Sequence, residues 1–251
     1  MTTRITGRVV GALFLSAFFL YGGGSFLVAS ATSSATPLPE NAASLGRLSA
    51  GAVMLLLNSV AVAAIGALAF RVLRSRDRRT AYAYLATRTA EGVLLALAPL
   101  GMLTLALLAL LARQGAEAPK VTGSGLAPLA RTAVENSQSA YWVAMAVLGV
   151  GSIFFCRALL KSALLPRFLA VWGMVGYAVF ALGSVLEIAG YEVGLPLSAP
   201  GGLFEVTAGV FLLIKGFRDA MPVGANDAPA ADANQGRTGA MVGVLASGAN
   251  A

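Results

Sequence analysis

Long apolar runs alternate with short polar connections through the first 218 residues of the chain. The first two runs, residues 9–28 and 48–70, contain no charged residue at all. The six runs cover residues 9–28, 48–70, 81–112, 140–160, 168–189 and 202–218. Because a helix needs about 20 mostly apolar residues to cross the hydrocarbon core of a bilayer, each run predicts a membrane-spanning helix. The expected fold class is therefore all-α: a polytopic bundle of six transmembrane helices, with the transmembrane domain covering residues 1–218.

Both ends of the chain differ from this pattern. Residues 219–251 are rich in Ala, Gly, Asn, Asp and Pro and show no apolar periodicity, which predicts a disordered cytoplasmic tail. At the other end, Arg4 and Arg8 precede an apolar run followed by Ala29-Ser30-Ala31, a pattern that also fits a signal peptide with a small-residue cleavage site. The run is longer than the roughly 7–15 residues of a signal sequence, so we expect an uncleaved first span. Cleavage, which would leave five spans, remains the alternative.

The basic residues predict how the helices are oriented. The net charge is +7, and most Lys and Arg residues lie in alternate connections between the runs. Twelve fall on one side: Arg4, Arg8, Arg71, Arg74, Arg76, Arg78, Arg79, Arg157, Lys161, Arg167, Lys215 and Arg218. Only four fall on the other: Arg47, Arg113, Lys120 and Arg131. Since cytoplasmic connections carry the excess of Lys and Arg, both termini are expected in the cytoplasm.

Composition narrows the possible functions. Hydrophobic residues make up 57% of the chain and charged residues only 12%, about half the charged share of a soluble domain. The chain has no His and a single Cys, Cys156, which excludes His-based acid–base chemistry, disulfides and Cys-rich metal centres. These absences favour a protein without enzyme activity, a membrane-embedded enzyme that acts on lipid stays open as a distant alternative, and we expect no cofactor and no metal. The bilayer is the expected partner and nucleic acid is not, while a homo-oligomer or a membrane protein partner stays open.

A few polar residues lie inside the predicted spans. Arg88 and Glu91 are three residues apart and so share one helix face, which Tyr84 and Leu95 continue. A charge near the centre of a span costs about 2.5–3.5 kcal/mol on insertion scales, so the pair needs partners.

Two other spans carry polar residues at a suitable position. Asn58 lies twelve residues from the basic end of the second run, about 18 Å along the helix, close to the depth of Glu91. We therefore expect an interhelical hydrogen bond between Asn58 and Glu91. Glu205, in the sixth run, would reach Arg88 if the two helices pack together.

This candidate intramembrane polar cluster (Asn58, Arg88, Glu91 and Glu205) has two interpretations. In the first, it is a satisfied structural network that sets the register of the helices. In the second, it is a site for a proton, an ion or a polar ligand, because ionisable groups inside a membrane are candidates for function. The charges compensate each other in part, which favours the structural interpretation.

Smaller patterns suggest how the helices meet. Gly7 and Gly11 are four residues apart, and Gly209 and Gly216 are seven apart, so each pair lies on one helix face. Such small residues predict close helix–helix contacts. Tyr141 lies near the end of a run, where an interfacial aromatic belt is expected.

Several motifs together resemble a known family. Arg4-Ile5-Thr6-Gly7 leads the first run, and Tyr84-Leu85-Ala86-Thr87-Arg88-Thr89-Ala90-Glu91 opens the third. Leu165-Pro166-Arg167-Phe168-Leu169-Ala170-Val171-Trp172-Gly173 precedes the fifth, and Phe204-Glu205 and Lys215-Gly216-Phe217 belong to the sixth. With Asn58, these motifs resemble the domain-of-unknown-function 4386 family of bacterial six-helix membrane proteins, over about residues 4–218.

The resemblance implies a multi-pass protein of the bacterial inner membrane and supplies no activity. It also implies that Arg88, Glu91, Glu205 and Lys215 belong to the recurring pattern of the family. The expected function is that of an integral membrane protein with a structural, sensory or partner-binding role. The alternative is a small-solute or proton-coupled transporter or channel that uses the polar cluster.

Overall fold

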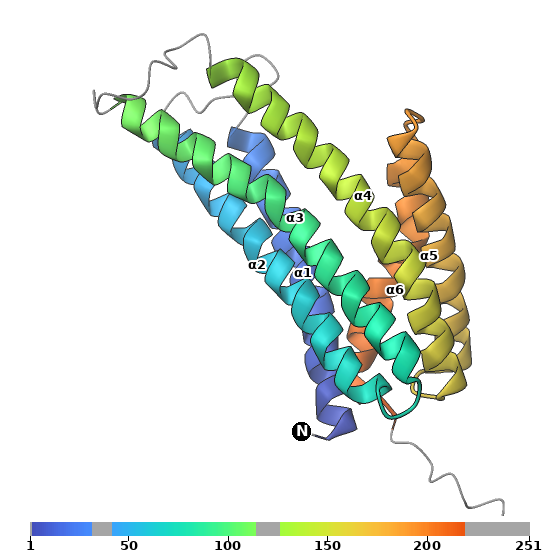
Figure 1. Cartoon of the computed structure of the whole chain (residues 1–251). Coiled ribbons are helices and arrows are strands. Elements are labelled where there is room, and N and C mark those ends of the chain that lie inside the picture. The colour runs from blue at the N-terminus through green and yellow to red at the C-terminus, as the bar shows by residue number, and fades with distance from the viewer. Residues whose placement is uncertain (1, 32–41, 114–125, 219–251) are drawn as a thin grey trace, which may run out of the picture. The chain divides into compact units, whose positions relative to one another are not determined.

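The computed structural model describes residues 2–31, 42–113 and 126–218, apart from the side chains of residues 105, 108, 109, 111–113 and 126–137 (Figure 1). The tail predicted at residues 219–251 lies outside the described residues. Within the described parts of the chain, all regular structure is helical. The six helices are α1 (Thr3–Ala31), α2 (Ala42–Leu73), α3 (Arg78–Arg113), α4 (Leu126–Lys161), α5 (Arg167–Ile188) and α6 (Gly194–Lys215). The prediction of an all-α chain with six helices is confirmed.

Among the residues that the structure describes, five helical stretches are long and apolar enough to cross a membrane. They are α1, α2, α5, α6 and the part of α4 that covers Gln138–Lys161. In α3 the charged residues Arg78, Arg79, Arg88 and Glu91 all lie in the first half, and residues 92–112 of the sequence carry no charge. The structure thus supports an integral membrane protein.

Every helix begins before its apolar run, and α1 to α4 also end after theirs, because backbone hydrogen bonding continues into flanking residues. One such difference is at α6, which begins at Gly194, inside a stretch that the sequence indicated as a connection. Pro196 lies in the first turn, where a backbone N–H would have no acceptor within the helix, so proline is tolerated there. The helix also continues through Pro200. Likewise α4 begins at Leu126, well before the apolar run at residues 140–160.

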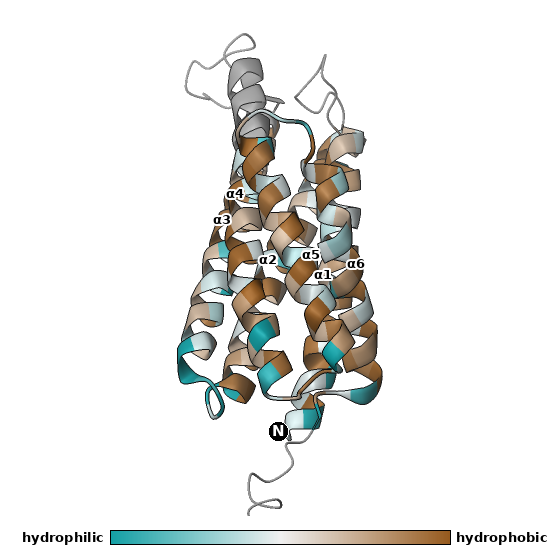
Figure 2. Ribbon diagram, turned by 90° about the vertical axis from the view of Figure 1, so that its right-hand side faces the viewer, coloured by the Kyte–Doolittle hydropathy of each residue, from teal (hydrophilic) through white to brown (hydrophobic). Residues whose placement is uncertain are grey.

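The helices form a closed ring in sequence order. Each helix packs on its neighbours in the chain, from α1·α2 to α5·α6, and contacts between α1 and α6 close the circle. The outer surface carries large exposed apolar side chains, such as Phe19, Phe26 and Leu203, as a lipid-facing surface does. Figure 2 shows hydrophobic residues along most of the length of the helices.

Glycines allow the ring to close between α1 and α6. A Cβ on Gly11 would clash with the backbone of Leu213 and Gly209, and a Cβ on Gly7 would clash with the backbone of Gly216. The predicted close helix–helix contacts at these glycines are therefore present. Gly216 has a φ of 72°, in the left-handed region that glycine adopts easily, and it ends α6.

The basic segments meet at one end of the ring. The Arg4 side chain donates to the Lys215 carbonyl oxygen at 3.3 Å, which joins the start of α1 to the end of α6. The Arg76 guanidinium donates to the Ser162 carbonyl oxygen at 3.0 Å, which joins the α2–α3 turn to the α4–α5 turn. Figure 2 shows hydrophilic segments gathered at this end, which also holds the chain's N-terminus.

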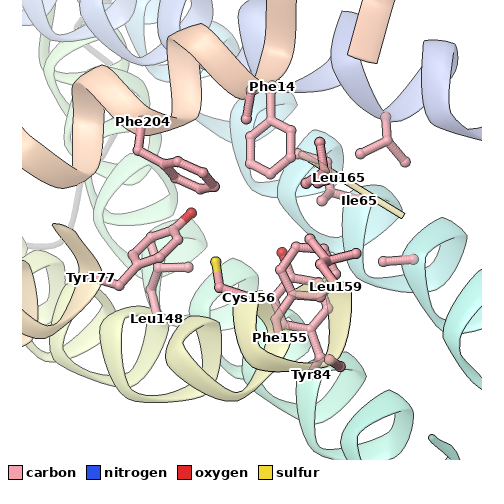
Figure 3. Close-up of a cluster of buried hydrophobic side chains, with 14 of the residues drawn as sticks. Phe14, Ile65, Tyr84, Leu148, Phe155, Cys156, Leu159, Leu165, Tyr177 and Phe204 are labelled. Atoms are coloured by element: carbon pink, nitrogen blue, oxygen red, sulfur yellow. The ribbon is translucent and has the colours of Figure 1, made fainter. Parts of the chain in front are cut away.

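The interior of the ring is filled by a large cluster of buried side chains. Phe14 of α1, Tyr84 of α3 and Tyr177 of α5 belong to it, together with Phe204 of α6 (Figure 3). Arg88 and Glu91 of α3 are buried beside this cluster, so these two charges lie among apolar and aromatic groups rather than in water.

Candidate functional site

The centre of the site is one face of α3. Tyr84, Arg88 and Glu91 are four and three residues apart, so the helical repeat places all three on the side that faces the inside of the ring. Arg88 and Glu91 are each only 2% exposed. The sequence-predicted stripe is thus an inward-facing one, and Leu95 continues it.

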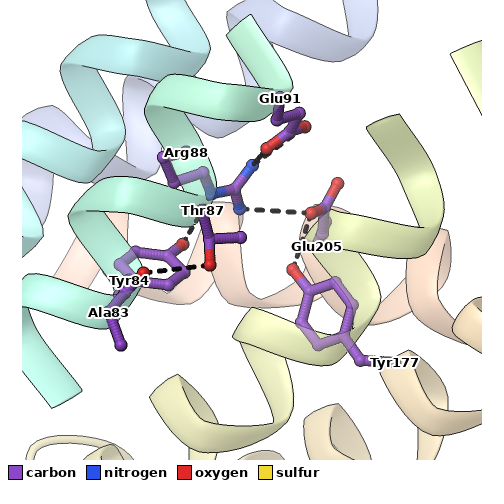
Figure 4. Close-up of polar contacts among 7 residues, drawn as sticks. All are labelled: Ala83, Tyr84, Thr87, Arg88, Glu91, Tyr177 and Glu205. Carbon is purple, nitrogen blue, oxygen red and sulfur yellow. Dashed lines mark hydrogen bonds and ion pairs between the residues drawn. The ribbon is translucent and has the colours of Figure 1, made fainter. Parts of the chain in front are cut away.

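Every nitrogen of the Arg88 guanidinium has a partner (Figure 4). Its Nε donates to the Tyr84 hydroxyl at 2.8 Å. Nη1 donates to the Glu91 carboxylate at 3.0 and 3.4 Å, and Nη2 donates to Glu205 Oε1 at 3.4 Å. The structure therefore brings Glu205 of α6 to Arg88 of α3, a contact that the sequence left conditional on how these helices pack.

The surroundings of Arg88 are shaped to hold its side chain. The rings of Phe14 and Tyr84 each lie 5.3 Å from the guanidinium carbon, within the range of cation–π attraction. On α2, Gly66 leaves the space that the Arg88 stem occupies, since a Cβ there would lie 2.5 Å from the Arg88 Cβ. The guanidinium is thus fixed by packing as well as by charge.

Glu205 has capacity left over. Its Oε1 accepts from Arg88 and also from the Tyr177 hydroxyl of α5 at 2.6 Å. Both contacts use the same oxygen, so Oε2 has no partner among the described residues (Figure 4). The Glu205 side chain is 15% exposed, and that exposure is to a cavity.

A cavity of about 210 Å³ lies next to the three charged residues. All six helices contribute to its wall, which is mostly apolar and aromatic. Its aromatic residues are Phe14, Phe18, Tyr21, Tyr141 and Phe180. Its strongly polar residues are Asn58, Arg88, Glu91 and Glu205. An apolar pocket with a few convergent polar groups is the usual form of a small-molecule site.

Asn58 lies on this cavity but does not make the expected contact. It is 4% exposed and lines the cavity together with Glu91. No hydrogen bond joins the two among the described residues, so the expected Asn58–Glu91 bond is absent. The Asn58 amide has no hydrogen-bonding partner in the part of the chain that the structure describes. Equal depth along two helices thus brought Asn58 and Glu91 to the same cavity without a hydrogen bond between them.

Two features of the site did not emerge from the sequence. Tyr177 orients Glu205, and the only sequence signal for it was a polar aromatic residue in the middle of an apolar run. Tyr141 was assigned to an interfacial belt, yet it lines the cavity and stacks on Tyr21 with 5.2 Å between ring centroids. Position along one helix does not reveal which residue of another helix faces it, so these pairings were not predictable.

The site offers binding groups rather than reactive ones. The described residues contain no group of three or more His, Cys, Asp or Glu side chains placed to hold a metal ion. What the residues do provide is an anchored charge cluster, an unpaired carboxylate oxygen and an unpaired amide, all beside an open volume. That arrangement suits the binding of a small polar or charged molecule.

Comparison with known proteins places the chain in a family. Neither the curated proteins nor the solved structures contain a chain with detectable similarity to this one. The family model described as "Domain of unknown function (DUF4386)" matches residues 9–216, which include every residue of the cluster and most of all six helices. The chain is thus a member of the DUF4386 family, and the predicted resemblance is confirmed.

Proposed function

We propose that this chain is a multi-pass inner-membrane protein that binds a small solute in the cavity at the centre of its ring of helices. The observation that carries the proposal is the cavity of about 210 Å³ with the unpaired Asn58 amide and Glu205 Oε2 on its wall. Among the described residues Ser152 Oγ is the one fully buried side-chain polar atom without a hydrogen bond, so the Asn58 amide and Glu205 Oε2 are accessible from the cavity. A solute in the cavity can therefore supply the hydrogen-bonding partners that the protein itself does not. Solute binding is the step that transport and sensing share.

The purely structural interpretation of the cluster has one observation in its favour. All three nitrogens of the Arg88 guanidinium are paired, as a register-setting network requires. That network accounts for Arg88 and Glu91. It does not account for Asn58 or for the volume beside it, and we therefore favour the solute-binding function.

The proposal includes the topology of the protein. Here α3 is the third of six transmembrane helices, inserted as part of the ring because its charges are paired inside. The end of the ring that holds the basic turns faces the cytoplasm, and both termini lie there. The wall of the cavity includes Tyr21, Tyr141 and Ser198, which lie toward the opposite end of their helices, so the solute enters from the non-cytoplasmic side.

Two neighbouring residues provide a direct test. Asn58 and Ser59 are adjacent, and both are about 95% buried, but only Asn58 lines the cavity, while the Ser59 hydroxyl donates to the Leu55 carbonyl oxygen. In a Cys156→Ala background, Asn58→Cys and Ser59→Cys are treated with methyl methanethiosulfonate, a small uncharged thiol reagent. We expect Asn58→Cys to react much faster than Ser59→Cys. Equal reactivity at the two positions would contradict a cavity that solutes can reach.

A cavity-filling variant extends the test. Ala17 of α1 lies on the cavity wall, so Ala17→Phe places a ring in the space that a solute would take. We expect this substitution to slow the labelling of Asn58→Cys, with Gly22→Phe as the matched control, because nothing lies within 4 Å of the Cβ position of Gly22.

A further inference from the structure

The chemistry of the cavity wall indicates which solute the site takes. The charged groups facing the cavity are one guanidinium and two carboxyl groups, Arg88 against Glu91 and Glu205. The Arg88–Glu91 contact at 3.0 Å matches one positive with one negative group. Glu205 is then a carboxyl group in excess, held in place by the Tyr177 hydroxyl.

The position of Glu205 makes this excess available to a ligand. Its Oε2 is the oxygen without a partner among the described residues, and its side chain lies on the cavity wall. In an environment of low dielectric constant, an unpaired carboxylate oxygen attracts a cation or a strong hydrogen-bond donor more than it does in water. Asn58 adds an amide oxygen, which also accepts hydrogen bonds.

The rest of the wall suits the same kind of ligand. Phe18, Tyr21, Tyr141 and Phe180 present aromatic rings to the cavity, and aromatic faces attract cations. No further basic residue is among the cavity-lining residues that the structure describes, so a positive ligand would meet only Arg88, which is already surrounded by partners. An anionic ligand would have to lie beside Glu205 and would meet a repulsive charge.

The size of the cavity limits the ligand. An engineered cavity of about 150 Å³ holds a benzene ring, so about 210 Å³ holds a ring with a short amine chain. We propose that the cavity binds a small primary amine in its ammonium form, with the ammonium group on Glu205 Oε2 and Asn58 and the apolar part against the aromatic wall. This inference rests on the proposed function and names the class of its solute.

Three ligands of nearly equal shape test the charge preference. They are phenethylammonium, the uncharged 2-phenylethanol and the anion phenylacetate. Binding to the full chain in phosphatidylcholine nanodiscs is measured by isothermal titration calorimetry, with empty nanodiscs as the control for partitioning into lipid. We expect phenethylammonium to bind about tenfold tighter than 2-phenylethanol or more, because a charge-assisted hydrogen bond replaces a neutral one. Phenylacetate should not bind measurably.

Two variants with the same change of charge locate the preference. Glu205→Gln keeps the shape of the side chain and removes the excess carboxyl group, so the cation should lose its advantage over the alcohol. Glu192→Gln makes the same change at an exposed position in the α5–α6 turn and should leave the advantage intact. If Glu205→Gln does not fold, the ligand series on the unmodified chain still decides.

The outcomes separate this inference from the proposed function. If the alcohol or the anion binds as tightly as the amine, the amine inference is wrong and solute binding stands. If none of the three binds, the amine inference also fails, and the reactivity of Asn58→Cys then shows whether the cavity admits solutes at all. An unreactive Asn58→Cys would overturn the proposed function as well.

Discussion

At the scale of single residues, the Arg88 guanidinium holds the centre of the ring together. It contacts Tyr84 and Glu91 on its own helix and Glu205 across the ring, and it is almost completely buried. A charge that is buried among partners contributes little net stability relative to apolar packing. Removing one partner nevertheless lowers the free energy of unfolding strongly, because the charged groups left behind are buried and unpaired.

Arg88→Met is therefore expected to lower the free energy of unfolding by about 3–5 kcal/mol, since it leaves both carboxyl groups without their partner. Unfolding in mixed micelles of increasing denaturing detergent measures the change. Arg157→Met is the control, because Arg157 is exposed on α4. This substitution should change the free energy of unfolding by no more than about 0.5 kcal/mol.

A double variant gives the same prediction a second test. If Arg88 and Glu91 stabilise each other, Arg88→Met combined with Glu91→Gln should cost less than the two single changes added together. Strict additivity, or an Arg88→Met cost no larger than that of Arg157→Met, would show that the pair is not coupled.

The sequence predicted this cluster in part, and the reason is physical. Arg88 and Glu91 were identifiable because charges inside an apolar run are expensive and so are rarely without a role. Glu205 followed as a further acidic residue inside a run. Tyr177 and the missing Asn58–Glu91 bond were not predictable, because both depend on how α2, α3, α5 and α6 are rotated against each other. That rotation is set by packing, which local patterns do not contain.

At the scale of helices, the contact between α1 and α6 decides whether the ring closes. Gly7 and Gly11 bring the backbone of α1 against that of α6. Because lipid is as apolar as the helices themselves, close packing of this kind is a main source of helix association.

Gly11→Ala is thus expected to destabilise the ring, since even one methyl group would clash with the backbone of Gly209 and Leu213. Backbone atoms cannot move aside as a side chain can, so α1 and α6 must separate. Gly22→Ala on the same helix is the matched control, because its Cβ would meet nothing within 4 Å. We expect a clearly lower thermal unfolding temperature in detergent for Gly11→Ala and none for Gly22→Ala. Equal unfolding temperatures would mean that the α1–α6 contact is not required.

The start of α3 depends on a cap. Asp77 precedes the helix, and its Oδ1 accepts from the Thr80 backbone N–H at 3.0 Å, while its Oδ2 accepts from the Thr80 hydroxyl at 2.8 Å. These hydrogen bonds, chiefly the one from the backbone, hold the pKa of the Asp77 carboxyl below its usual range. A lowered pKa means that the ionised form is the one that stabilises the folded helix.

Asp77→Ala should therefore lower the stability of the start of α3 by about 1 kcal/mol at neutral pH. Faster hydrogen exchange of the backbone amides in the first turn of α3 would measure this loss. The contribution of Asp77 is complete above the unfolded pKa of about 3.9 and is lost as the pH falls through the lower folded pKa. The exchange difference between the natural chain and Asp77→Ala should thus shrink below about pH 4. Asp77→Asn, which caps without titrating, should show no such change relative to Asp77→Ala. A difference that stays constant down to pH 2 would argue against an ionised cap.

Helix number was predictable and helix limits were not. Apolar runs of about 20 residues follow from the thickness of the bilayer, so six runs correspond to six helices. The limits depend on capping and on contacts outside the apolar core. The start of α6 at Gly194, within a segment rich in Gly and Pro, shows that such a segment forms helix where neighbours support it.

At the scale of the ring of helices, the two ends differ in charge. The turns that hold Arg76 and Ser162 meet at one end, together with the start of α1 and the end of α6. The turn between α5 and α6 lies at the far end of α5, about 33 Å away along a helix of 22 residues. The cavity-lining residues Tyr21 and Ser198 belong to that half of the ring. Orientation therefore determines from which side a solute reaches Glu205.

The proposed orientation predicts a specific pattern of labelling in intact cells. Ser75, in the basic α2–α3 turn, and Glu192, in the α5–α6 turn, are both exposed, and the native Cys156 is fully buried and should stay silent. A membrane-impermeant maleimide should modify Glu192→Cys in intact cells and should modify Ser75→Cys only after the membrane is permeabilised, because cytoplasmic turns carry the basic residues. The reverse pattern would place the basic end outside, and the cavity would then open toward the cytoplasm. Labelling of both positions in intact cells would contradict a chain that crosses the membrane between these turns. Only the expected pattern is compatible with a solute that enters from outside the cell membrane and meets Glu205 in the middle of the ring.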